Sequence, residues 1–188
     1  LVENFIAGTE YRFFVLDGKC EAVLLRVPAN VVGDGKHTIA QLVEMKNQDP
    51  LRGRDHRSPL EIIDLGDVEK LMLQQQGYTP DDIPADRVRV DLRRNSNIST
   101  GGDSIDVTDI MPDDYKTLAA QMARAVGAWV CGVDLIIPDK SLPASKEEPN
   151  CACIELNFNP AIYLHTYCHE GPGQALTPKI LAKLFPEI

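Results

Sequence analysis

Apolar residues recur along the 188-residue chain with two different periods, and these periods predict its secondary structure. Period-two alternation or an unbroken apolar run indicates strands, which we expect at 10–17, 20–28, 87–92, 129–137 and 151–158. The first two flank an Asp-Gly turn and should form a hairpin. The last two should pair antiparallel. Within the middle strand, the alternation places three residues inward: Val88, Val90 and Leu92.

Helical spacing of apolar residues predicts four helices, at 38–47, 67–76, 113–126 and 177–184. Three of them start at residues that commonly cap helices, namely Thr38, Asp67 and Thr177. Together the elements predict an α+β fold with a mainly antiparallel sheet and flanking helices. The length corresponds to roughly one domain.

Charge and hydropathy exclude two classes of partner. The chain has 19 basic and 28 acidic residues, a net charge of −9, whereas binding to a phosphate backbone requires a basic surface. No apolar run approaches the roughly 20 residues that span a bilayer. We therefore expect no nucleic-acid or membrane partner and a cytoplasmic location. Because Leu1 is not a start methionine, we also expect a fragment of a larger chain.

The five cysteines are odd in number and lie in apolar, strand-like sequence, which is typical of reduced thiols. Cys151 with Cys153, or His165 with His169, could be read as half of a zinc site. Neither pair has a second pair at the usual distance. We therefore favour packing of these residues in the core, with Cys151 and Cys153 acting as small apolar side chains.

Polar residues interrupt the last two apolar strands, at Asp134 in one and at Glu155 and Asn157 in the other. Glu155 and Asn157 are two residues apart and share one face, and an antiparallel neighbour can place Asp134 beside them. Two adjacent carboxylates favour a bound cation, and oxygen donors favour Mg²⁺ or Mn²⁺. The alternative is an exposed face or a structural ion pair with an arginine such as Arg12 or Arg26.

Several long strings resemble the later part of ATP-grasp ligases. They are 3–12 (ENFIAGTEYR), Asp134 within its strand, and 155–160 (ELNFNP). Segments 26–38 and 97–102 are similar to the cyanophycin-synthetase-like branch. The tail, 163–173, is most similar to the glutathione synthetase module of bacterial bifunctional glutamate–cysteine ligase/glutathione synthetases.

The resemblance implies a site for ATP and two Mg²⁺ or Mn²⁺ ions. Glu3 and the hinge Asn4-Phe5-Ile6 would meet adenine, and Glu10 would bind the ribose hydroxyls. Without the resemblance, both glutamates are simply acids at strand ends. The metal ligands would be Asp134, Glu155 and Asn157, with Glu155 shared by both ions. The hairpin arginines Arg12 and Arg26 would add positive charge at the nucleotide.

The resemblance also implies a reaction in which a carboxylate is phosphorylated by ATP and an amine then attacks the acyl phosphate. The expected substrates are γ-glutamylcysteine and glycine. Candidates for holding the acyl phosphate lie in the polar loop 93–102, namely Arg94, Asn97, Gly101 and Gly102. An ordinary surface turn with solvated arginines is the alternative interpretation of that loop.

In the related ligases a preceding subdomain supplies further phosphate-binding groups. We therefore expect residues 1–188 to be an ATP-grasp domain fragment that is inactive alone and works with the rest of a larger chain. A cyanophycin-type ligase, a non-catalytic Mg-nucleotide-binding module and a structural domain remain alternatives. The sequence leaves the oligomeric state open, a homodimer included.

Overall fold

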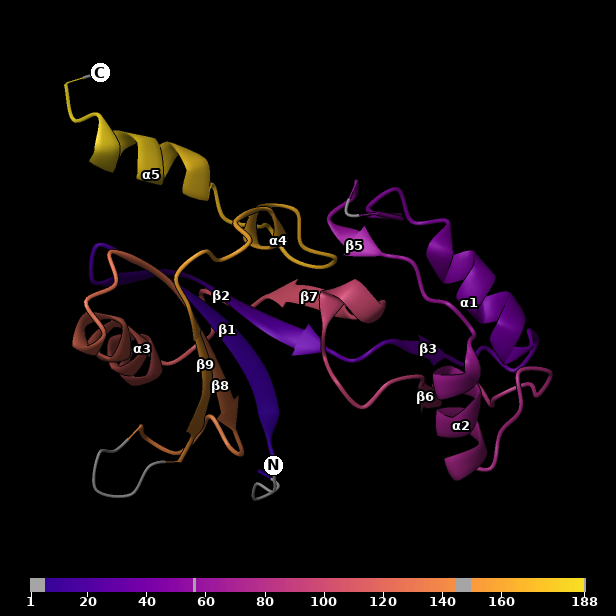
Figure 1. Ribbon diagram of the computed structural model, residues 1–188. Coiled ribbons are helices and arrows are strands. Elements are labelled where there is room, and N and C mark those ends of the chain that lie inside the picture. Colours follow the sequence, from indigo (N-terminus) through magenta and orange to yellow (C-terminus); the bar gives the residue numbers. More distant parts are fainter. Residues whose placement is uncertain (1–5, 56, 145–149, 188) are drawn as a thin grey trace. The chain divides into compact units, whose positions relative to one another are not determined.

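The computed structural model describes residues 6–55, 57–144 and 150–187. The chain divides into two compact units (Figure 1). The first unit combines the chain up to Leu25 with the chain from Ile105 onward, and the second unit is Arg26–Ser104. The chain passes from the first unit to the second at the end of one strand and returns along another.

A five-stranded sheet in the order β7-β2-β1-β8-β9 organises the first unit. Its strands are β1 (Thr9–Leu16), β2 (Lys19–Val27), β7 (Asp103–Asp106), β8 (Val130–Ile137) and β9 (Ala152–Asn157). The pairs β1–β2, β1–β8 and β8–β9 are antiparallel. This confirms both the predicted hairpin and the predicted strand pair.

Both faces of the sheet are covered at β1, which carries apolar residues on alternate sides. Phe13 and Val15 pack in one core cluster with residues of helix α3 (Asp113–Ala125). Phe14 and Leu16 pack in another cluster with Leu176 of helix α5 (Leu176–Leu184). The short helix α4 (Tyr163–Thr166) also lies on this second side, where the ring of His165 meets Phe14.

The second unit has its own core, formed by nine buried apolar residues: Ala29, Val31, Ile39, Leu42, Val43, Ile63, Leu73, Val90 and Leu92. They come from helices α1 (Ile39–Asn47) and α2 (Asp67–Gln75), the antiparallel pair β3 (Asn30–Val32) and β6 (Arg89–Asp91), and adjoining loops. The short strands β4 (Arg52–Gly53) and β5 (Leu60–Glu61) pair in parallel, and η1 (Ile98–Thr100) is a single 3-10 turn.

Helix α1 begins with a capping box, as the sequence predicted. The Thr38 hydroxyl accepts from Gln41 N at 3.2 Å, and Gln41 Oε1 accepts from Thr38 N at 2.9 Å. We expect Thr38→Ala to lower the free energy of unfolding by about 1 kcal/mol, because an N–H of the first turn loses its partner. Urea denaturation followed by circular dichroism measures the change. Thr38→Ser keeps the hydroxyl and is the control, so an equal loss in both variants would contradict this account.

Three local expectations were wrong. Helix α2 is capped by Gly66, whose N–H donates to Glu69 Oε2 at 3.0 Å, so Asp67 lies in the first turn. Helix α5 starts at Leu176, which is fully buried, so Thr177 lies inside the helix and is not its cap. Pro178 is tolerated in the first turn because the N–H groups there have no partner within the helix. Val88 is 38% exposed because a turn at Ala85 shortens the strand, with Val88 N donating to Ala85 O.

All five cysteines are free thiols. Cys131 and Cys168 are buried and Cys151 packs against the first unit's core, but Cys153 is exposed, which corrects its expected role as a core side chain. Burial raises the pKa of Cys20 to about 12. In the part of the chain that the structure describes, no three His, Cys, Asp or Glu side chains gather in a metal-binding group, and none of the helices is both long and apolar enough to cross a bilayer.

Candidate active site

Four polar side chains meet on the neighbouring strands β1, β8 and β9 of the sheet in the first unit. Asp134 on β8 lies opposite Arg12 on β1 and opposite Glu155 on β9. Arg12 Nε donates to Asp134 Oδ1 at 2.6 Å, and Arg12 Nη2 donates to Asp134 Oδ2. Asn157, oriented by its neighbours, donates from its amide nitrogen to Glu155 Oε1 at 3.1 Å and accepts from Arg12 Nη2 at 3.2 Å. We call these four residues the acid cluster.

The electrostatics of the acid cluster favour an additional cation. Asp134 is only 2% exposed, whereas Glu155 is exposed. Burial alone would lower the pKa of the Arg12 guanidinium, but Asp134, and beyond it Glu155 and Glu10, raise the pKa. Within the acid cluster itself one guanidinium lies beside two carboxylates, so these four side chains carry a net negative charge, which suits a divalent cation.

The donor set also fits the expected ion. Asp134, Glu155 and Asn157 present only carboxylate and amide oxygens at one place on the sheet, which suits Mg²⁺ or Mn²⁺ and not zinc. The predicted juxtaposition of these three side chains is confirmed. The alternative interpretation, an ion pair with Arg12, is observed for Asp134.

The residues expected at the base and sugar of ATP are only partly described. Glu3, Asn4 and Phe5 lie outside the described residues. Ile6 is 38% exposed and precedes β1. Glu10 is half-buried on the same face of β1 as Arg12.

The loop residues expected to hold the acyl phosphate belong to the second unit, together with Arg26. Arg26 Nη2 donates to Asn97 Oδ1 at 2.8 Å. The N–H groups of Gly101 and Gly102 donate within the turn, to Ile98 O and Asn97 O. A side chain would not fit at either glycine: a Cβ at Gly101, where φ is +87°, would lie 2.7 Å from Ile63, and one at Gly102 would lie 2.9 Å from Asn97 O.

Arg94 lies apart from this turn. Its Nη2 donates to Gln75 Oε1 at 2.8 Å, and it lines a cavity of about 280 Å³ with apolar side chains of α2. Among the residues expected in the loop, the structure thus brings Asn97 to Arg26 and places Arg94 against a helix.

A buried ionic network supports the turn at Gly101 and Gly102, which we call the glycine turn. The sequence analysis did not predict this network. The Arg52 side chain is fully buried and donates to Asp103, to Gly101 O at 3.2 Å and to Glu61 O at 2.7 Å. Lys46 Nζ donates to Asp103 Oδ2 at 2.7 Å. Asp103 directly follows Gly102, and this acidic residue was the one sequence feature that could have indicated an ion pair at this end of the loop.

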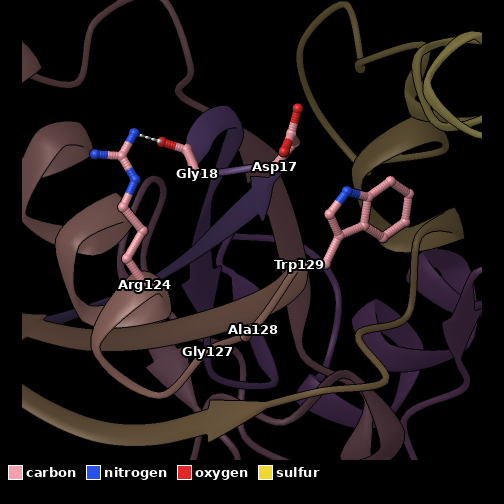
Figure 2. A pocket seen from close by; sticks show the side chains of 6 residues that line it. All are labelled: Asp17, Gly18, Arg124, Gly127, Ala128 and Trp129. Atoms are coloured by element: carbon pink, nitrogen blue, oxygen red, sulfur yellow. Dashed lines mark hydrogen bonds between the residues drawn. The ribbon is translucent and has the colours of Figure 1, made fainter.

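A separate cavity of about 350 Å³ lies at the hairpin turn of the first unit, and none of the residues that line it belongs to the acid cluster (Figure 2). Arg124 Nη2 donates to Gly18 O at 2.7 Å, and Trp129 lies on the other side of the turn in this view. Asp17 is paired with Lys183 at 2.6 Å. Because its charged groups already have partners, this cavity offers little to a charged ligand.

Comparison with known proteins connects these features. No protein-family model matches the chain. Over all 188 residues the chain is 73% identical to the glutathione biosynthesis bifunctional protein of Streptococcus thermophilus and 74% identical to that of Streptococcus mutans, covering 25% of each. A crystal structure of a bifunctional glutathione synthetase from Pasteurella multocida matches 98% of the chain, with 54% identity and a TM-score of 0.89, and the chain covers 25% of it.

The chain is homologous to one quarter of these bifunctional proteins. The resemblance that the sequence showed is thereby confirmed, and so is the α+β class with its mainly antiparallel sheet. The chain spans about a quarter of the length of the relatives it matches, which agrees with the expectation of a segment of a larger protein.

Proposed function

We propose that the chain forms part of an ATP-dependent carboxylate–amine ligase that joins γ-glutamylcysteine to glycine. The observation that carries this proposal is the acid cluster, in which Asp134, Glu155 and Asn157 direct oxygen donors to one place. The names of relatives that are more than 70% identical over the whole chain support it. A cytoplasmic location is part of the proposal and is consistent with five free thiols.

In this proposal, Asp134, Glu155 and Asn157 would hold two Mg²⁺ or Mn²⁺ ions, which would supply positive charge against the phosphates of ATP. Glu155 is the more exposed of the two carboxylates in the acid cluster and would be the ligand common to both ions. Glu10, with Glu3 and the 4–6 hinge, binds the nucleoside of ATP. Arg12 lies beside the ligands and contributes positive charge near the phosphates.

The residues proposed to hold the acyl phosphate belong to the second unit. Arg26 and Asn97 are joined by a hydrogen bond and present a cation and an amide next to each other. Gly101 and Gly102 shape the turn that carries Asn97, since their own N–H groups are used within it. Arg94, which lies apart from this turn and donates to Gln75, would have to leave that contact to serve as a bidentate partner for a free substrate carboxylate. Positioning and charge stabilisation then account for catalysis, with no covalent enzyme intermediate.

Phosphate release by the full-length protein tests the proposed reaction. We expect ATP-dependent release to require both γ-glutamylcysteine and glycine, because the acyl phosphate forms on one substrate and is consumed by the other. Omission of either substrate should reduce release to background in a coupled phosphate assay. Turnover with aspartate or arginine and an acidic peptide primer, but not with glycine, would establish the cyanophycin-type alternative. Nucleotide binding without phosphate release would establish a non-catalytic module.

A further inference from the structure

His165 is fully buried on α4, and neither ring nitrogen has a hydrogen-bond partner among the residues that the structure describes. Buried polar groups without partners are costly and uncommon in folded proteins, so this one requires an explanation. Burial, and after it the charge of Arg12, lower the pKa of His165 to about 3. The ring is therefore neutral, with one nitrogen that can only accept a hydrogen bond.

His165 lies on the same side of the sheet as the acid cluster. Its ring meets Phe14 edge-on, with ring centroids 5.6 Å apart. Phe14 and Arg12 are two residues apart on β1, so their side chains project from one face. Asp106 raises the pKa of His165 slightly against the effects of burial and Arg12, and its carboxylate accepts hydrogen bonds from Gln174 and Thr108.

Arg12 occupies both oxygens of the most deeply buried carboxylate in the acid cluster. Its Nε donates to Asp134 Oδ1, and its Nη2 donates to Asp134 Oδ2. A divalent cation that binds Asp134 would share those oxygens with a guanidinium, and two cations at such short range repel strongly. A guanidinium has only donors, so it needs another acceptor if it gives up Asp134.

We propose that Arg12 and the divalent cation compete for Asp134, and that His165 is the positioning residue that accepts the Arg12 guanidinium once the cation holds the carboxylate. Arg12 then acts as an internal counter-ion that keeps the site folded without metal. The inference rests on the proposed function in one respect, the assignment of Asp134 as a metal ligand. It adds that metal affinity is set by a side-chain exchange within the first unit.

Mn²⁺ binding to the full-length protein, followed by electron paramagnetic resonance of the free ion, tests the exchange, with Asp134→Asn as the reference that shows how much of the binding belongs to this site. His165→Phe keeps the edge-on contact with Phe14 but removes the acceptor, and should weaken Mn²⁺ binding about tenfold without lowering the stability of the metal-free chain. His165→Gln restores an acceptor and should recover much of that affinity. Arg12→Gln removes the competitor and should bind Mn²⁺ at least tenfold more tightly than the natural chain.

A second readout separates exchange from simple charge repulsion. The Arg12 Nε–H resonance in nuclear magnetic resonance, identified by its loss in Arg12→Lys, should stay protected from solvent exchange when Mg²⁺ is added. In His165→Phe, Mg²⁺ should remove that protection, because the released guanidinium finds no acceptor. If Arg12→Gln does not fold, Arg12→Lys should show a smaller gain in Mn²⁺ affinity.

Each result that contradicts the proposal would reject a different part of it. Unchanged Mn²⁺ affinity and unchanged Nε–H protection in His165→Phe would show that His165 is only a buried ring. No gain in affinity in the folded Arg12 variants would overturn the competition. Asp134→Asn should abolish Mn²⁺ binding to this site; if it binds as the natural chain does, the metal site of the proposed function is wrong, whereas failure of the histidine variants alone leaves that function intact.

Discussion

Glu155→Gln in the full-length protein should lower kcat for ligation roughly 10³-fold, which corresponds to about 4 kcal/mol of lost transition-state stabilisation. Glutamine keeps the size of the side chain but removes the charge that balances two cations in the proposed site. Asn157→Ala should cost less, about tenfold, because it removes one neutral oxygen ligand and leaves both carboxylates in place.

The mutations can be compared without a folding artefact. Glu155 is exposed, so its replacement should leave the urea midpoint of the protein unchanged. Glu170→Gln is a matched control, since it makes the same change at another exposed glutamate in the same unit, and it should retain full activity. Raising Mg²⁺ should rescue Asn157→Ala in part and Glu155→Gln hardly at all. Similar small losses in both variants would contradict the two-ion assignment.

The acid cluster was predictable from sequence because it depends on local rules. Side-chain alternation fixes Glu155 and Asn157 on one face of β9, and antiparallel pairing of neighbouring strands brings Asp134 to them. The choice between a metal site and an ion pair was not predictable. Arg12 and Asp134 are 122 residues apart in the chain, and only the register of β1 against β8 places the guanidinium on that carboxylate.

The ionic network that supports the glycine turn was not predictable from the sequence for a similar reason. Arg52 lies in a charged, turn-rich stretch that reads as solvent-exposed, and its burial follows from a partner 51 residues away. The two buried ring nitrogens of His165, which lack hydrogen-bond partners among the described residues, were not predictable either, because the sequence of a short helix does not show which residues pack against it. Local periodicity thus predicts elements and shared faces, whereas buried ionic partners depend on tertiary packing that no local pattern records.

The network of Asp103 should dominate the stability of the second unit. Asp103→Asn leaves Arg52 buried and Lys46 largely buried without their carboxylate, and should lower the free energy of unfolding by about 3–5 kcal/mol, the usual cost of breaking a buried ion pair from one side. Asn30, whose amide nitrogen donates to Asp103 Oδ2 at 3.1 Å, would lose part of its interaction too.

Asp64→Asn provides the matched control for this last prediction. Asp64 pairs with Arg54 at 2.9 Å in the same unit, but both side chains are more than 60% exposed, so its loss should cost less than about 1 kcal/mol. Trp129 is the chain's single tryptophan and lies in the first unit, so its fluorescence does not report directly on the second. Far-ultraviolet circular dichroism in urea, with amide hydrogen exchange over residues 26–104, measures the effect. Equal losses of unfolding free energy in Asp103→Asn and Asp64→Asn would mean that the buried ion pair stabilises the second unit no more than an exposed one does. The turn at Gly101 and Gly102 would then be held by its backbone hydrogen bonds alone.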